Sequence, residues 1–294
     1  MTNAFRLTNV SKRYEHFAME KINLCLPEGE IMGLIGVNGA GKSTLLRILA
    51  GLSLADSGEV QVLGLQLPAD QVEIKRQIGL ASEDMRLYGS QTLRWHMDFM
   101  AKVYGSWDEA YATKLLRRFD LNENQPVASF SHGQRVKGLL LLNFARRPRL
   151  LLLDEPTTGL DPVARAEVLD ALSDVLLDGA RSVLFSSHNA HDIERLADTI
   201  TFIHGGRLIA NLDTESYLSA WRRVLGHGTL ADEVTDWPEV AQVRRSGATT
   251  EITFKSYGIA LNERLAAQGF EIDAIYPMSL EEIFITTIRG AAQQ

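Results

Sequence analysis

The pattern G-x-x-x-x-G-K-[ST] occurs at residues 36–44, which read Gly-Val-Asn-Gly-Ala-Gly-Lys-Ser-Thr. A nearly continuous apolar run, residues 30–35, precedes it, and residues 43–50 follow with the apolar spacing of a helix. Such a run is typical of a strand buried on both faces, so the motif joins a buried strand to a helix. In that context glycines let backbone N–H groups surround a phosphate at the positive end of the helix. We expect Lys42 to contact the β- and γ-phosphates of a nucleotide and Ser43 to hold Mg²⁺. The alternative is an ordinary glycine-rich turn.

Two acidic residues, Asp154 and Glu155, follow a second buried run at residues 150–153. In open α/β sheets, ligands bind at the carboxyl ends of the strands. We therefore expect Asp154 to lie beside the Mg²⁺ and Glu155 to polarise an attacking water. The alternative is that the two acids only solvate the end of a strand, but the phosphate loop favours the first interpretation.

The other apolar patterns predict a mostly parallel sheet covered by helices, because strands and helices alternate along the chain. Three consecutive helical segments, residues 92–103, 108–119 and 131–146, predict a helical subdomain inserted at about 85–146. We expect one domain over residues 1–220 and a small α/β domain over residues 225–294. The expected strands are residues 5–10, 22–26, 59–63, 77–80, 149–153, 182–186, 199–204, 207–210, 239–245, 250–254 and 270–276, and the further expected helices are residues 162–177, 191–196, 259–268 and 280–288.

Composition argues against several other classes of protein. The 294 residues include 30 Lys and Arg and 37 Asp and Glu, so the net charge of −7 argues against a general basic surface for nucleic acid. A single cysteine, Cys25, allows no internal disulfide and fits a reducing cytoplasm. The first ten residues lack the pattern of a signal peptide, and no apolar run approaches the roughly 20 residues that span a bilayer. If the protein works at a membrane, we expect a partner to supply the spanning part.

Further motifs lie in a fixed order around the phosphate loop and the two acids. They are Tyr14, residues 130–135 (Phe-Ser-His-Gly-Gln-Arg), residues 156–161 (Pro-Thr-Thr-Gly-Leu-Asp) and residues 186–188 (Ser-Ser-His). With these motifs, residues 5–215 resemble the nucleotide-binding subunits of ABC transporters. The resemblance implies a P-loop NTPase core with antiparallel N-terminal strands beside the mostly parallel sheet, and it implies ATP and Mg²⁺ as ligands.

The resemblance also implies a role for each motif. Catalysis is assigned to Glu155, His188 and Lys42, and the Mg²⁺ ligands are Ser43, Asp154 and Glu83. Tyr14 stacks on the adenine. The full set of residues that bind the nucleotide is Tyr14, Gly36, Asn38, Gly39, Ala40, Gly41, Lys42, Ser43, Thr44, Glu83, Ser131, Gly133, Gln134 and Asp161.

Several of these residues have a purely structural alternative. Ser131 is suited to cap the helix that follows it, and because that helix end can also face a γ-phosphate, the two roles coexist. Asp161 before Pro162 is a strong signal for a helix start. His188 could be a hydrogen-bonded histidine at a strand end, and Tyr14 could be a core or surface aromatic.

Two positions depart from the family pattern. Glu83 stands where the family usually has Gln; a carboxylate can still ligate Mg²⁺ or water, but it adds negative charge near the phosphates. His132 stands where Gly is commonest in the signature, although Ser131 and Gly133 remain.

The resemblance implies two protein partners. A second copy of the chain docks head to tail, so that Ser131, Gly133 and Gln134 of one copy face the ATP held by Lys42 of the other. The other partner is an integral membrane permease, a separate chain that uses the energy of ATP binding and hydrolysis. We expect an exporter because residues 277–284 resemble the tail of exporter-type ATPases, and we expect the protein in the cytoplasm at the inner face of the cell membrane.

The segment after Glu83 has two alternative roles, and the chain has two alternative functions. Met85 and Leu87 either receive a cytoplasmic helix of the permease or pack under a loop. There are two alternatives to a transporter ATPase. In the first, the chain is a non-transport ABC ATPase that acts on nucleic acid or ribosomes; in the second, it is a binding module that uses ATP only as a switch. The chain shows neither a second cassette nor a long coiled coil, which argues against the first, and Glu155 and His188 argue against the second.

Overall fold

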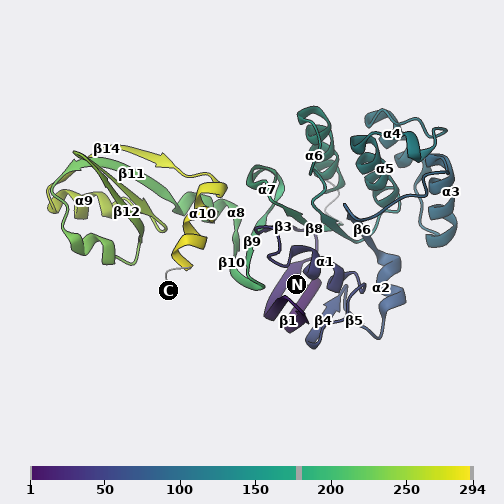
Figure 1. Ribbon diagram of the computed structural model, residues 1–294, viewed down its shortest axis with the longest axis horizontal. Coiled ribbons are helices and arrows are strands. Elements are labelled where there is room, and N and C mark those ends of the chain that lie inside the picture. Colours follow the sequence, from purple (N-terminus) through teal and green to yellow (C-terminus); the bar gives the residue numbers. More distant parts are fainter. Residues whose placement is uncertain (1, 177–180, 292–294) are drawn as a thin grey trace. The chain divides into compact units, whose positions relative to one another are not determined.

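The computed structural model describes residues 2–176 and 181–291 (Figure 1). Residue 1, residues 177–180 and residues 292–294, which our domain and helix predictions include, lie outside the described residues. The chain divides into two compact units, Met1–Asn211 and Leu212–Gln294. The first unit contains two sheets and the second contains one, and each unit has its own hydrophobic core.

The centre of the first unit is a six-stranded sheet with the order β10-β9-β3-β8-β7-β6. The pairs β3–β8, β3–β9, β7–β8 and β6–β7 are all parallel, and every residue of β7 and β8 is buried, as expected for a sheet covered on both faces. The mostly parallel sheet that we predicted is therefore confirmed. The strands are β3 (Ile31–Ile35), β6 (Ile78–Ser82), β7 (Leu150–Asp154), β8 (Ser182–Ser187), β9 (Thr199–His204) and β10 (Arg207–Asp213).

A second, antiparallel sheet packs beside the first and confirms the predicted N-terminal strands. Its order is β2-β1-β4-β5, and its buried side chains share one core with helix α1 (Lys42–Leu49). The short strand β5 and the helix α2 (Gln71–Gln77) lack a strong apolar period and were not predicted. The strands are β1 (Asn3–Tyr14), β2 (Phe17–Pro27), β4 (Ser57–Val62) and β5 (Leu65–Leu67).

Between β6 and β7 the chain forms the predicted helical subdomain, which gathers on one side of the unit (Figure 1). Side-chain caps fix where its helices begin: Thr92 accepts the N–H of Trp95 at 3.2 Å, and Asp108 accepts the N–H of Tyr111 at 2.8 Å. The subdomain consists of α3 (Leu93–Tyr104), α4 (Glu109–Arg118), the short 3₁₀ helix η1 (Val127–Ser129) and α5 (His132–Phe144). Two further helices, α6 (Pro162–Leu176) and α7 (Ala190–Leu196), follow β7 and β8.

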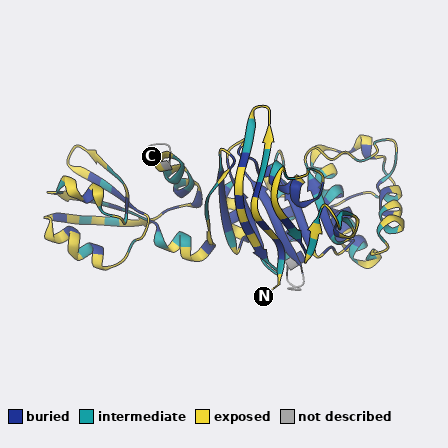
Figure 2. Cartoon of the chain, turned by 90° about the horizontal axis from the view of Figure 1, so that it is seen from below, coloured by how far each residue is buried: buried dark blue, intermediate teal, exposed yellow. Residues whose placement is uncertain are grey.

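The second unit is a four-stranded antiparallel sheet with the order β12-β13-β11-β14. Its core contains Val224, Ile252, Phe254, Leu265 and Phe270, while many outer residues are exposed (Figure 2). A capping box starts α10, because the Ser279 N–H donates to Glu282 Oε2 at 2.9 Å and the Glu282 N–H donates to Ser279 Oγ at 3.3 Å. The elements are α8 (Thr214–Ala220), β11 (Arg222–Gly228), the 3₁₀ helix η2 (Asp232–Asp236), β12 (Val240–Ser246), β13 (Thr249–Phe254), α9 (Ala260–Ala267), β14 (Phe270–Pro277) and α10 (Leu280–Ala291).

Candidate active site

The phosphate loop lies between β3 and α1, where two glycines are needed for steric reasons. A Cβ at Gly36 would lie 2.5 Å from the carbonyl oxygen of Ile203, and a Cβ at Gly41 would lie 2.8 Å from the ring of Phe17. Gly41 also has a φ of +112°. As the N-cap of α1 it supplies no side-chain hydrogen bond, so the first N–H groups of that helix have no side-chain cap. This helix start can therefore receive an anion.

Lys42 is a buried cation that links the phosphate loop to the end of β7. Its Nζ donates to the carbonyl oxygen of Gly36 at 2.7 Å and lies 3.2 Å from Glu155 Oε1, and its side chain is 6% exposed. A buried ammonium is stable only when it is paired and hydrogen-bonded. The loop carbonyl and the carboxylate together meet that requirement.

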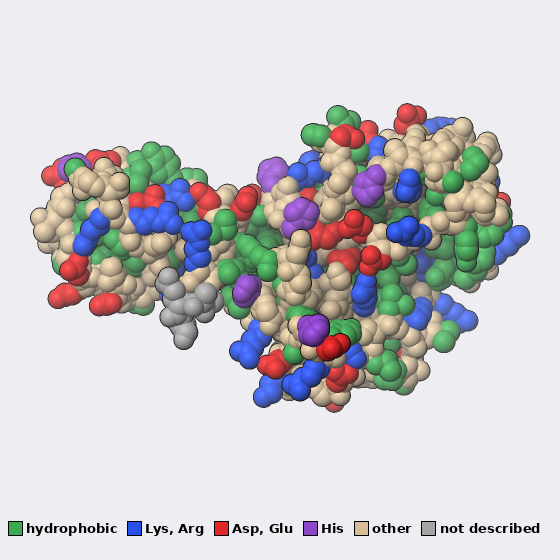
Figure 3. Space-filling view, viewed as in Figure 1, with side chains coloured by type: hydrophobic (Ala, Val, Ile, Leu, Met, Phe, Trp, Pro, Cys, Tyr) green, Lys and Arg blue, Asp and Glu red, His purple; other side chains and the backbone are tan. Residues whose placement is uncertain are grey.

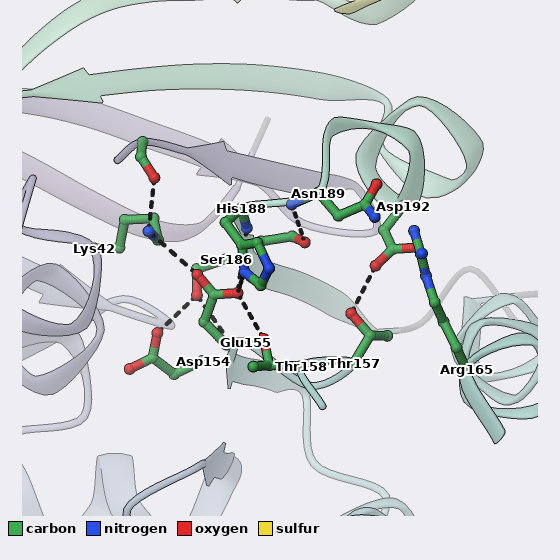
Figure 4. Close-up of polar contacts among 12 residues, drawn as sticks. Lys42, Asp154, Glu155, Thr157, Thr158, Arg165, Ser186, His188, Asn189 and Asp192 are labelled. Atoms are coloured by element: carbon green, nitrogen blue, oxygen red, sulfur yellow. Dashed lines mark hydrogen bonds and ion pairs between the residues drawn. The ribbon is translucent and has the colours of Figure 1, made fainter. Parts of the chain in front are cut away.

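Glu155 accepts several hydrogen bonds on one carboxylate oxygen (Figure 4). Oε2 receives Thr158 Oγ1 at 3.0 Å, the N–H of His188 at 3.2 Å, and a contact from His188 Nδ1 at 2.6 Å. Burial raises the pKa of Glu155, but the hydrogen bond from His188 and the charge of Lys42 outweigh it, and the pKa lies below its ordinary value. Glu155 therefore carries a negative charge at neutral pH.

Asp154 is fixed by the neighbouring strand. Ser186, opposite Asp154 in the parallel register of β7 and β8, donates its hydroxyl to Asp154 Oδ1 at 2.7 Å. The same hydroxyl oxygen accepts the N–H of Glu155 at 3.0 Å. One serine thus orients both acids at the carboxyl edge of the sheet.

A single cleft brings together the phosphate loop, the aromatic residue near the N-terminus and two of the predicted acids. Acidic side chains gather in the middle of this face of the first unit, with lysine, arginine and histidine around them (Figure 3). Five lining residues were not predicted: Glu15, His16, Phe17, Val37 and Arg47. The predicted residues that line the cleft are Tyr14, Asn38, Gly39, Ala40, Gly41, Lys42, Ser43, Thr44, Glu83 and Glu155.

Tyr14 presents a half-exposed ring at the rim of this cleft. The ring is stacked beside Phe17, with centroids 6.5 Å apart, and the hydroxyl lies 3.2 Å from Ser53 Oγ. Tyr14 is therefore held in place while part of its ring remains accessible to a planar ligand. Phe17 is a neighbour that the sequence pattern alone did not single out.

Comparison with known proteins identifies the family. The family model for ABC transporters matches residues 19–158. The ABC transporter ATP-binding protein YtrB of Bacillus subtilis (strain 168) is 33% identical to this chain over 92% of the chain and 93% of that protein. The chain belongs to the ATP-binding proteins of ABC transporters. The predicted resemblance is confirmed, and this ABC ATPase binds and hydrolyses ATP to energise a transporter.

Other relatives of the ABC ATPase agree with this assignment. The daunorubicin resistance ATP-binding protein DrrA2 of Streptomyces coeruleorubidus is 33% identical over 82% of this chain and 75% of that protein. The Nod factor export ATP-binding protein I of Sinorhizobium fredii is 34% identical over 70% of this chain and 62% of that protein. A solved structure of an ATP-binding subunit of an ABC transporter, 29% identical, covers 74% of this chain and 92% of that one with a TM-score of 0.67.

The signature of the ABC ATPase lies outside the cleft that contains Lys42. None of the described residues that line that cleft belongs to residues 131–134. Ser131 caps α5: its Oγ accepts the N–H of Gln134 at 3.1 Å, and its own N–H donates to Gln134 Oε1 at 2.9 Å. The predicted capping role is confirmed, and Ser131 remains exposed at the helix start.

Asp161 also lies outside the cleft lining and caps the start of α6. Its Oδ1 accepts the N–H groups of Val163 at 2.9 Å and Ala164 at 3.0 Å, which confirms the predicted cap. These bonds hold the pKa of Asp161 below its ordinary value. His132, which departs from the family pattern, makes a contact that was not predicted: its Nε2 lies 3.0 Å from the carbonyl oxygen of Thr158 in the same chain.

Proposed function

We propose that two copies of this chain enclose two ATP molecules head to tail and drive a membrane permease that exports its cargo. The separation of Lys42 from Ser131 within one chain carries this proposal. Lys42 lines the cleft, whereas Ser131 is exposed at the start of α5, outside the cleft lining. A second copy can supply the other wall of the nucleotide site, because the start of its α5 is exposed to solvent and suits a γ-phosphate.

Within each cleft, Tyr14 stacks on the adenine and residues 36–44 surround the phosphates. Mg²⁺ fits a donor set of Ser43, Asp154 and Glu83, because a hydroxyl and carboxylates are the hard oxygen ligands that it prefers. Among residues 2–176 and 181–291, no three His, Cys, Asp or Glu side chains form a ready-made metal cluster. Phosphate oxygens of the nucleotide would supply further ligands, as is usual for Mg²⁺ at nucleotide sites. When bound, Mg²⁺ neutralises charge on the β- and γ-phosphate oxygens.

The chain's own residues then position the attacking water. Glu155, charged and held by His188 and Thr158, accepts a hydrogen bond from that water and polarises it. Lys42 leaves Glu155 for the more strongly charged phosphates when ATP binds. His188 contacts the γ-phosphate and keeps Glu155 oriented. Catalysis is then mainly positioning and charge stabilisation.

The relatives support export. Two of them are named for daunorubicin resistance and for Nod factor export, and both are more than 30% identical to this chain. In the described part of the chain, no helix is long and apolar enough to cross a membrane. Because the relatives are ATP-binding proteins of transporters, we infer that the permease is a separate chain and that this subunit sits peripherally at the inner face of the membrane. The net charge of −7 argues against nucleic acid as a partner.

An apolar groove in the first unit suits the permease. It lies among α2, β6, α3, α5 and residues 85–88, and it includes Leu87 and Phe99. Met85 is 43% exposed and lines the same groove. Lys75, Arg86 and Arg146 also line it, whereas none of its described lining residues is Asp or Glu. An amphipathic segment that carries a carboxylate matches both the apolar surface and the positive charge.

The head-to-tail arrangement can be tested by mixing two defective variants. Lys42→Ala disables the phosphate loop, and Ser131→Arg blocks the start of α5. We expect neither homodimer to occlude labelled ATP. A mixed dimer has one site that combines an intact loop with an intact α5, so the mixture should recover occlusion at one site. Failure to recover it, with heterodimers demonstrated by two affinity tags, contradicts the arrangement.

A further inference from the structure

A buried carboxylate outside the nucleotide cleft connects three elements around the catalytic pair. Asp192, in the first turn of α7, is 1% exposed. Thr157 Oγ1 donates to Asp192 Oδ2 at 2.6 Å (Figure 4). Arg165, in the first turn of α6, approaches Oδ1 with Nε at 2.8 Å and Nη2 at 2.6 Å. We call these three residues the Asp192 cluster.

Both oxygens of Asp192 are used, which fixes the geometry of the cluster. A buried charge is tolerated only when it is paired and hydrogen-bonded, and Asp192 is held at both oxygens, Oδ1 by the hydrogen bond from Arg165 Nε and Oδ2 by the hydroxyl of Thr157. Thr157 then has a defined place, because its hydroxyl must reach the remaining oxygen. The cluster therefore fixes where the loop after β7 lies relative to α7.

In the sequence, the Asp192 cluster has one member close to Glu155 and another close to His188, the two residues in contact. Thr157 is two residues beyond Glu155, and Asp192 is four residues beyond His188. On the other side of that contact, Asp154 pairs with Ser186 in the sheet register. The catalytic pair is thus held by the sheet on one side and by the bond from Thr157 to Asp192 on the other.

Glu155 itself needs such support. Its φ is +53°, a conformation that non-glycine residues seldom adopt. Conformations of this kind persist only where the surroundings over-determine them, and they gather at active sites. The Thr157 bond constrains the backbone two residues away, so it helps to hold Glu155 in this conformation.

We propose that Asp192 is a positioning residue for ATP hydrolysis. It acts through Thr157 and Arg165, and it keeps the loop after Glu155 and the helix after His188 in register so that the two side chains meet. This inference rests on the proposed roles of Glu155 and His188. The alternative is a purely structural role, in which the cluster only fastens α6 to α7.

The chain offers matched controls for that alternative. Arg195 of α7 and Asp170 of α6 form a second ion pair between the same two helices, at the surface and away from Thr157. Thr201 is a buried threonine in β9 whose Oγ1 donates to Asn211 Oδ1 at 3.0 Å. Asp170→Asn therefore tests helix fastening alone, and Thr201→Val tests the loss of a buried threonine hydroxyl alone.

The experiment measures kcat, KM for ATP and Tm of the purified full chain. We expect Thr157→Val to lower kcat roughly tenfold or more, because small misplacements of catalytic groups are costly, and to leave KM nearly unchanged. Thr157→Ser, which keeps the hydroxyl, should restore kcat. Asp192→Asn should lower kcat as well. Asp170→Asn and Thr201→Val should keep wild-type kcat, and Thr201→Val should lower Tm about as much as Thr157→Val.

Two results would overturn the inference. One is wild-type kcat in Thr157→Val; the other is an equal fall of kcat in Thr157→Val and Thr201→Val, which would show a general effect of lost stability. Glu155→Gln separates this failure from that of the proposed function. If Glu155→Gln stays active, the proposed role of Glu155 fails; if it is inactive while Thr157→Val is fully active, only the role of the Asp192 cluster fails.

Discussion

Replacing Glu155 by Gln should nearly abolish hydrolysis while ATP still binds. The amide keeps the shape of the side chain, and its oxygen can take the place of Oε2, which receives His188 and Thr158. Its NH₂ group then occupies the place of Oε1, 3.2 Å from the ammonium of Lys42, and cannot accept a hydrogen bond. The variant therefore loses both the charge that polarises the water and the partner of Lys42.

The expected loss of kcat is about 100- to 10,000-fold, the range for a general base, or about 3–5 kcal/mol of barrier. ATP affinity should not weaken, because Lys42 no longer has to leave a carboxylate to reach the phosphates. Phosphate release measures the first quantity, and binding of a fluorescent ATP analogue measures the second.

Size-exclusion chromatography with ATP and Mg²⁺ completes the test of Glu155→Gln. The variant should elute as a persistent dimer, because the nucleotide that joins the two copies is not consumed. The wild type hydrolyses the ATP that joins the two copies, so it should elute mainly as a monomer. Turnover of the variant within tenfold of the wild type would refute the assigned role of Glu155, whatever its elution profile.

Three further predictions concern other residues. Glu83→Gln should keep turnover because an oxygen still faces the metal, whereas Glu83→Ala should lower turnover roughly tenfold or more with little change in ATP affinity; equal turnover of all three forms would separate Glu83 from the chemistry. Tyr14→Ala should weaken ATP binding by about 1–3 kcal/mol, the value of a stacked base, while Tyr14→Trp should bind nearly as well as the wild type in the same titration. In the second unit, the hydrogen bond to Asp273 and its charge raise the pKa of His227 above 6.5, so Asp273→Asn should lower the His227 pKa in an NMR titration. Because the folded pKa is the raised one, the contribution of this pair to stability is complete below pH 6.5 and is lost as the pH rises through the folded pKa.

The parts of the site that could be predicted from sequence are those whose geometry is local. The phosphate loop, the acids at the end of β7 and the caps at Ser131 and Asp161 each depend on residues only a few positions apart. Backbone geometry then fixes their arrangement. The parallel sheet follows in the same way, since a run such as Leu150–Asp154, buried throughout, suits only a strand covered on both faces.

The contacts that could not be predicted depend on residues far apart in the chain. Thr157 and Asp192 are separated by 35 positions, and no local pattern indicates that they meet. The central strand β11 was missed for a different reason. Its sequence, RRVLGHG, contains two arginines and two glycines, which weaken the apolar signal, yet Val224 near its centre is fully buried. Tertiary packing decides both cases.

The capping box at α5 bears on how the signature can take part in catalysis at all. In the isolated subunit, the backbone N–H of Ser131 is already bound by the side chain of Gln134, and the Ser131 hydroxyl oxygen accepts the N–H of Gln134. A γ-phosphate that approaches this helix end must compete with the Gln134 side chain for the Ser131 N–H. A neutral cap contributes about 1 kcal/mol, whereas hydrogen bonds to an ionised oxygen are roughly twice as strong as neutral ones. We therefore expect the phosphate to replace Gln134 as the acceptor of the Ser131 N–H. We propose that the cap keeps the signature ordered before ATP arrives and yields its donors when a second copy brings the nucleotide, so that Ser131 serves both as a structural cap and as a phosphate ligand in trans.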